Sequence, residues 1–100
     1  MSPRIAIDRQ KIAEFCRKHH IRKLSLFGSV LRDDFRPNSD VDVLVEFEPG
    51  HTLGLIGMAG LELELSAMLG RQADVRTPAE ISRYFRQRVL ESAEVQYAGE

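Results

Sequence analysis

The spacing of hydrophobic residues in the first part of the chain predicts a helix from Asp8 to about His20. Asp8 is a candidate N-cap, and Ile7 and Ile12 are placed as a hydrophobic staple around it. Four residues recur at helical spacing and are expected to face the core: Ile12, Phe15, Cys16 and His19.

Two strands are predicted next, over residues 23–27 and 41–47. The first is a short apolar run that ends at Gly28, and a short helical turn from Ser29 to about Asp34 and a turn at residues 36–39 are predicted to follow it. The second alternates strictly, so that one face carries Val41, Val43, Val45 and Phe47 and belongs to the core. Its other face is expected to be open or occupied by cations, because it carries Asp40, Asp42, Leu44, Glu46 and Glu48.

Residues 53–69 predict a long apolar helix that ends at Gly70. Glu62 and Glu64 interrupt this stretch, which favours a buried or interfacial helix over a membrane span. It has two apolar stripes, one of Met58, Leu61, Leu65 and Met68, the other of Ile56, Ala59, Leu63 and Ala67. The helix is therefore either internal to the fold or docked on a partner or a second copy.

The last part of the chain predicts a strand, a helix and a possible edge strand. Residues 73–76 form the strand, and Thr77 and Glu80 then form a capping box that predicts a helix reaching about Ala93. Residues 95–97 are the possible edge strand. The order αβαβαβα indicates an α/β (α+β) fold with a small mixed sheet, in one domain over residues 1–100.

The predicted connections bring polar residues to one edge of that sheet. An antiparallel pairing of the first two strands places Gly28 and Ser29 beside Asp40 and Asp42. Gly28 leaves room for a phosphate near the backbone, and Ser29 is a candidate N-cap beside free amides that favour an anion. Asp40 and Asp42 alternate onto one side of their strand, where their oxygens suit hard divalent cations.

Further along the chain, Asp74 is the best candidate for a third metal ligand. Its strand is predicted to run parallel beside residues 41–47, as a right-handed crossover through the long helix. Asp74 is also a candidate for the base that activates a hydroxyl, or for the group that positions this base. Arg32 and Arg36 lie in the intervening segment, where they can neutralise triphosphate charge.

The stretch from Gly28 to Val45 resembles the GSx10DxD signature of the DNA polymerase β-like nucleotidyltransferases. It is most similar to the minimal nucleotidyltransferases that serve as antitoxins in HEPN/MNT toxin–antitoxin pairs. The resemblance covers nearly the whole chain, including Arg32, Ser39, the Phe-Glu-Pro-Gly stretch at residues 47–50, the Gly-Leu-Glu-Leu-Glu helix at 60–64 and Ala73-Asp74-Val75.

This resemblance implies a nucleotidyltransferase core that binds ATP and Mg²⁺, with two ions expected. Catalysis and metal binding are expected at Asp40, Asp42 and Asp74, and nucleotide binding at Gly28, Ser29, Arg32 and Ser39. In the antitoxin branch, AMP is transferred to a tyrosine of the partner HEPN ribonuclease and silences it. Two alternatives stay open: a non-catalytic antitoxin that acts by binding, and a nucleotide-transferring subunit for a small-molecule or RNA acceptor.

Composition restricts the expected binding partners and the expected cellular compartment. Fourteen basic and fifteen acidic residues give a net charge of −1, so no global basic field favours direct nucleic-acid or membrane binding. The single Cys16 and the absence of a signal-peptide pattern favour the cytoplasm. Cys16 is expected to be inert core, and Arg83, Arg86 and Arg88 a solvated or partner-binding face. The spacing of His19, His20 and His51 indicates no metal site.

Overall fold

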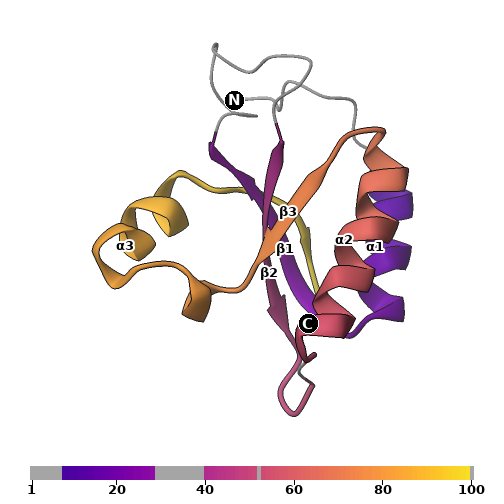
Figure 1. The fold of residues 1–100 in the computed structure, drawn as a ribbon, viewed down its shortest axis with the longest axis horizontal. Helices are drawn as coiled ribbons and strands as arrows, with labels where there is room; N and C mark the ends of the chain where they lie inside the picture. Colours follow the sequence, from indigo (N-terminus) through magenta and orange to yellow (C-terminus); the bar gives the residue numbers. More distant parts are fainter. Residues whose placement is uncertain (1–7, 29–39, 52, 100) are drawn as a thin grey trace.

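The computed structural model describes residues 8–28, 40–51 and 53–99. These residues form helices and a set of neighbouring strands (Figure 1). They are α1 (Arg9–Lys18), β1 (Ile21–Phe27), β2 (Val41–Phe47), α2 (Leu55–Leu69), β3 (Ala73–Arg76), the 3₁₀ turn η2 (Pro78–Glu80), α3 (Arg83–Ser92) and β4 (Glu94–Ala98). The predicted short helix from Ser29 and turn at residues 36–39 lie outside the described residues.

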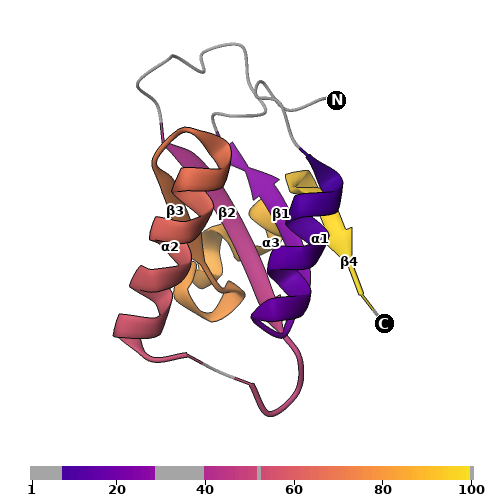
Figure 2. The ribbon, with the colours of Figure 1, turned by 90° about the vertical axis from the view of Figure 1, so that its right-hand side faces the viewer.

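The strands form one mixed sheet in the order β3-β2-β1-β4. β1 pairs antiparallel with both β2 and β4, whereas β2 and β3 run parallel through the α2 crossover. The predicted pairings and the edge strand are confirmed, although β1 begins two residues earlier than expected, at Ile21. α1 and α2 lie together on one face of the sheet and α3 on the other side (Figure 2).

The core lies between the sheet and the pair α1 and α2. Val41, Val43 and Val45 are fully buried there, as the alternation in β2 predicted. The expectation that the opposite face of β2 is open or occupied by cations is wrong at Leu44, which is only 2% exposed. η2 packs against β2 and covers this part of the sheet.

Asp8 caps α1 as predicted. Its carboxylate accepts hydrogen bonds from the backbone N–H groups of Gln10 and Lys11. Ile12, Phe15 and Cys16 are buried, while His19 lies at the margin of the core. Ile7, the other half of the predicted staple, lies outside the described residues.

The predicted continuous helix over residues 77–93 is wrong. The Thr77–Glu80 capping box is present, but it starts only the short turn η2. Ile81 then takes an extended conformation that buries its side chain, and Ser82 caps α3 through the N–H of Tyr84. A second good N-cap and a buried isoleucine therefore outweigh the helical preference of the segment.

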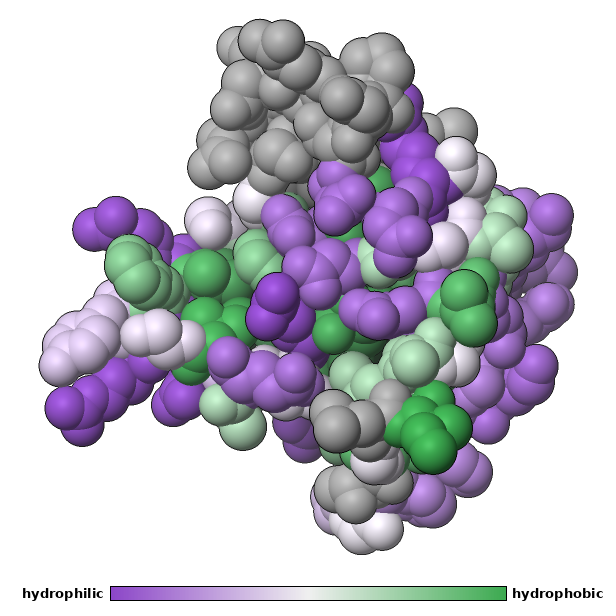
Figure 3. Space-filling view, in the orientation of Figure 1, coloured by the Kyte–Doolittle hydropathy of each residue, from purple (hydrophilic) through white to green (hydrophobic). Residues whose placement is uncertain are grey.

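α2 has one buried and one exposed apolar stripe. It begins at Leu55, two residues later than predicted, and ends at Gly70 in the left-handed conformation. Leu61 and Leu65 are buried, whereas Ile56 is 90% exposed, so a wholly internal helix is excluded. Hydrophobic residues reach the surface over α3 and the start of α2 (Figure 3). Among the described residues, no helix is long and apolar enough to cross a membrane.

Candidate functional site

The parallel pairing of β2 and β3 places two of the predicted acidic residues side by side. Asp42 and Asp74 are direct register partners. Partners on adjacent strands are about 5 Å apart and point to the same side of the sheet. Both aspartates therefore lie on the face opposite α1 and α2, and the central geometric requirement for a shared site is met.

Gly28 brings the end of β1 against the same carboxylate. Phe27, the last residue of β1, is the register partner of Asp42. A Cβ atom built at Gly28 would lie 2.3 Å from Oδ2 of Asp42, and Gly28 has a φ of +76°. Only glycine is accommodated at this point, because any side chain would both strain the backbone and displace Asp42.

Asp40 directly precedes β2 and is exposed, two positions from Asp42 along the chain. The structure therefore places Gly28, Asp40, Asp42 and Asp74 at one end of the sheet, where β1 ends and β2 and β3 begin. Four other residues assigned to the nucleotide or its charge lie outside the described residues: Ser29, Arg32, Arg36 and Ser39.

The strand that carries Asp74 is fixed by polar side chains of α2. The N–H of Ala73 donates to Ser66 Oγ over 2.8 Å, and the N–H of Val75 donates to Glu62 Oε2 over 2.9 Å. These bonds satisfy backbone donors on the free edge of β3, on either side of Asp74. These two hydrogen bonds explain why polar residues interrupt the apolar α2. The sequence analysis did not find this role.

Arg76 is a further member of the site that the sequence analysis missed. Its guanidinium donates to Oδ2 of Asp74 over 3.1 Å. The two residues alternate onto one face of β3, a signal already present in the sequence. Arg76 therefore offsets some of the negative charge that three neighbouring aspartates bring to this end of the sheet.

The donor set suits a hard divalent cation. Carboxylate oxygens are the preferred ligands of Mg²⁺, and Gly28 leaves the Asp42 carboxylate room beside the backbone. The side chains do not form a closed three-ligand cluster in the described part of the chain. One carboxylate oxygen of Asp74 is instead engaged by the guanidinium of Arg76.

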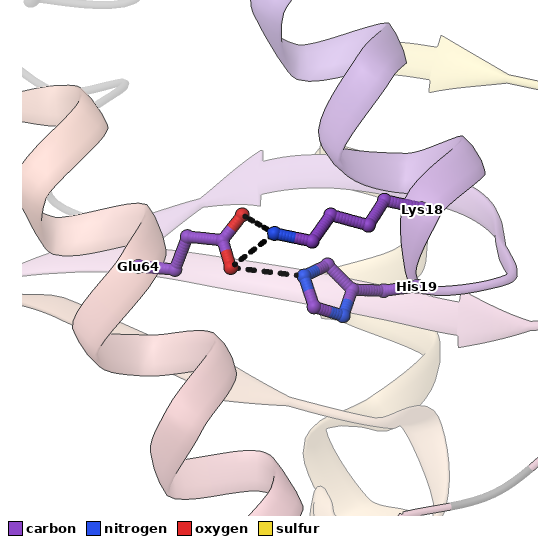
Figure 4. Close-up of polar contacts among 3 residues, drawn as sticks. All are labelled: Lys18, His19 and Glu64. Atoms are coloured by element: carbon purple, nitrogen blue, oxygen red, sulfur yellow. Dashed lines mark hydrogen bonds and ion pairs between the residues drawn. The ribbon is translucent and has the colours of Figure 1, made fainter.

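A separate polar cluster joins α1 to α2 (Figure 4). Glu64 receives a hydrogen bond of 3.1 Å from His19 and lies 3.4 Å from Lys18 Nζ. Desolvation tends to raise the pKa of Glu64, but the hydrogen bonds and charges of His19 and Lys18 outweigh it and lower the pKa below its ordinary value. This cluster fastens two helices together and is remote in the fold from the aspartates.

Two expectations about charged residues are corrected by the fold. His20 and His51 do approach each other, beside Glu48, although their spacing in the sequence indicated no metal site. Arg86 does not belong to a solvated basic face with Arg83 and Arg88, because its guanidinium donates to the carbonyls of Pro78 and Ile81.

Cys16 behaves as predicted. It is fully buried, and burial raises the pKa of its thiol to about 12. A thiol of this kind is almost entirely protonated at neutral pH, so it is neither a nucleophile nor a metal ligand in the folded protein.

Comparison with known proteins agrees with this arrangement. The nucleotidyltransferase domain family matches residues 9–95. A candidate protein adenylyltransferase of Methanocaldococcus jannaschii is 35% identical over 85 residues, which cover 85% of this chain and 89% of that protein.

Solved structures share the fold. A toxin–antitoxin crystal structure with AMP-PNP has a TM-score of 0.75 at 23% identity, over 94% of this chain and 76% of the other. The structure of a tri-AMPylated Shewanella oneidensis HEPN toxin in complex with MNT antitoxin has a TM-score of 0.66 at 23% identity. The match covers 90% of this chain and 69% of the other. The sheet order, the position of the acidic residues and the family match lead to one conclusion: this chain belongs to the nucleotidyltransferase domain family.

Proposed function

We propose that this protein is a Mg²⁺-dependent protein adenylyltransferase. It transfers AMP from ATP to a tyrosine of a partner HEPN ribonuclease and acts as the antitoxin of that ribonuclease. The observation that carries the proposal is the Asp42–Asp74 register pair with Gly28 against Asp42. The names of the Methanocaldococcus and Shewanella proteins supply the acceptor class.

Each residue of the site has a proposed role. Asp40, Asp42 and Asp74 hold two metal ions, and Gly28, Ser29, Arg32 and Ser39 hold the triphosphate. Bound metal would neutralise charge on the triphosphate and on the attacking oxygen. Arg76 is placed to hold Asp74 when no cation is bound, because its guanidinium lies 3.1 Å from that carboxylate.

The proposed reaction is an in-line displacement at phosphorus. The tyrosine hydroxyl oxygen bonds to the α-phosphorus of ATP, and the bond from that phosphorus to the oxygen bridging to the β-phosphorus breaks. Pyrophosphate leaves, and AMP remains on the tyrosine. Asp74 accepts the phenolic proton or positions the group that does, because a carboxylate beside the acceptor can act as a general base.

The decisive experiment is transfer of label to a HEPN protein encoded beside this chain. Label is expected from ATP labelled at the α-phosphate and not from ATP labelled at the γ-phosphate. Asp42→Asn should abolish transfer. Glu46→Gln is the matched control, since Glu46 lies on the same face of β2 but pairs with Arg22 at the other end of the strand. Equal transfer by wild type and Asp42→Asn would refute the proposal.

Neutralisation by binding alone remains a separate outcome of the same system. Its structural basis would be the exposed apolar side chains of α2 and α3, such as Leu63 at 74% and Tyr84 at 80% exposure. If Asp40→Asn/Asp42→Asn protects cells as fully as wild type, occlusion and not adenylylation silences the toxin.

A further inference from the structure

A second potential metal site lies at the opposite end of the β1–β2 pair. His20 directly precedes β1, while Glu48 and His51 lie in the turn that follows β2, at the bottom of Figure 1. Gly28 lies eight residues from His20, which corresponds to roughly 26 Å along an extended strand. This cluster is therefore distinct from the aspartate site.

The three side chains already gather around one point. Their potential ligand atoms all lie within 4.8 Å of one another. The rings of His20 and His51 stack with centroids 4.0 Å apart and an angle of 11°, and Nδ1 of His20 lies 4.0 Å from Oε1 of Glu48. Among the described residues, this is the group of three potential ligands that meets such a geometry.

Backbone hydrogen bonds hold the three residues in place. The N–H of Glu48 donates to the carbonyl of His20 over 2.8 Å, and the N–H of His51 donates to the carbonyl of Glu48 over 3.0 Å. His20 has a φ of +59°, a left-handed conformation that glycine usually occupies after a helix. Histidine is among the non-glycine residues that adopt this conformation most readily, and here it ends the α1 segment and leads the chain into β1.

We propose that His20, Glu48 and His51 bind one divalent transition metal, with Zn²⁺ as the best fit. Two imidazoles and one carboxylate are a characteristic zinc donor set, and they leave positions open for water. The lone pair of each imidazole nitrogen lies in the plane of its ring, so His20 and His51 must rotate out of their stacked arrangement before both can reach the usual zinc distance of about 2.0–2.2 Å. The bound metal would join the end of α1 to the β2–α2 turn.

The cysteine and the third histidine of the chain do not compete for the metal. The buried thiol of Cys16 has a pKa of about 12, and His19 is engaged by Glu64. Glu48 and His51 also line an open groove of about 470 Å³, so the site is reachable from solvent.

The test is Zn²⁺ titration of the tag-free, EDTA-dialysed full chain by calorimetry, with Co²⁺ absorption as a second readout. We expect a site that survives in Asp42→Asn and shows no thiolate charge-transfer band. His51→Ala, Glu48→Gln and His20→Asn should each weaken it by more than about tenfold. Asn is chosen at position 20 because it tolerates the left-handed conformation.

His19→Ala is the matched control and should retain zinc affinity, and His51→Ala should retain adenylyl transfer. Zinc should also raise the melting temperature of wild type and His19→Ala but not of His51→Ala. The proposal is overturned if wild type binds no zinc, or if binding is lost in Asp42→Asn and kept in His51→Ala.

Discussion

Glu62 of α2 accepts a hydrogen bond of 2.9 Å from the backbone N–H of Val75, next to Asp74. The bond crosses from a helix to the free edge of β3 and fixes the strand that carries the third carboxylate. Glu62 is therefore a positioning residue, and its loss should disturb both stability and the site.

Glu62→Ala should lower the free energy of unfolding by about 1–2 kcal/mol, because it leaves the Val75 N–H without its acceptor. Hydrogen exchange at the Val75 amide should become faster, and adenylyl transfer should fall. Glu62→Gln keeps a carbonyl acceptor, so it should restore most of the stability and most of the adenylyl transfer. Unchanged protection of the Val75 amide in Glu62→Ala would contradict this role.

Gly28→Ala should inactivate the enzyme. The new Cβ would lie 2.3 Å from Asp42 Oδ2, and a displacement of about 1 Å at a catalytic carboxylate can cost about 100-fold in rate. Gly50→Ala is a closely matched control, because Gly50 has a φ of +82° but no atom within 4 Å of the added Cβ. Both variants should lose about 1–2 kcal/mol from the left-handed backbone, and only Gly28→Ala should lose transfer activity. Equal activity in the two variants would exclude a role for the Gly28–Asp42 contact.

Glu64 should make stability depend on pH. Its lowered pKa means that the folded state favours the carboxylate, so this contribution is present above the ordinary value of 4.5 and is lost as pH falls through the lowered value. Because Glu64 is partly exposed, Glu64→Gln should cost no more than about 0.5–1 kcal/mol at neutral pH. Urea unfolding of both proteins as a function of pH measures this difference, which should shrink below the ordinary pKa. A stability difference for Glu64→Gln that stays constant over this pH range would refute the linkage.

Arg86 should matter for stability more than its neighbours on α3. Its guanidinium donates to the carbonyls of Pro78 over 2.8 Å and Ile81 over 3.1 Å, where the chain breaks between η2 and α3. Arg86→Ala should therefore lower the free energy of unfolding by about 1.5–3 kcal/mol. Arg88→Ala, which alters an exposed position, should stay within about 0.5 kcal/mol of wild type in the same urea titration. Equal losses of unfolding free energy in the two variants would show that Arg86 does not stabilise the break between η2 and α3.

Much of the fold and of the candidate site follows from local sequence features. The strict alternation over residues 41–47 predicted β2 to the residue, and Asp8 and Gly70 marked helix ends through their own capping chemistry. The resemblance at Gly28, Asp40, Asp42 and Asp74 indicated the reaction class. These features can be predicted from the sequence because side-chain periodicity and capping depend on residues a few positions apart.

Tertiary structure alone decided the remainder, because it depends on contacts between distant residues. The break between Glu80 and Ser82 depends on burial of Ile81 and on Arg86, and the role of Glu62 depends on the unpaired edge of β3. His20 and His51 are more than thirty positions apart in the chain, and their approach requires the β1–β2 pairing. Local sequence encodes the elements, whereas the packing of edges and turns sets which polar side chains meet.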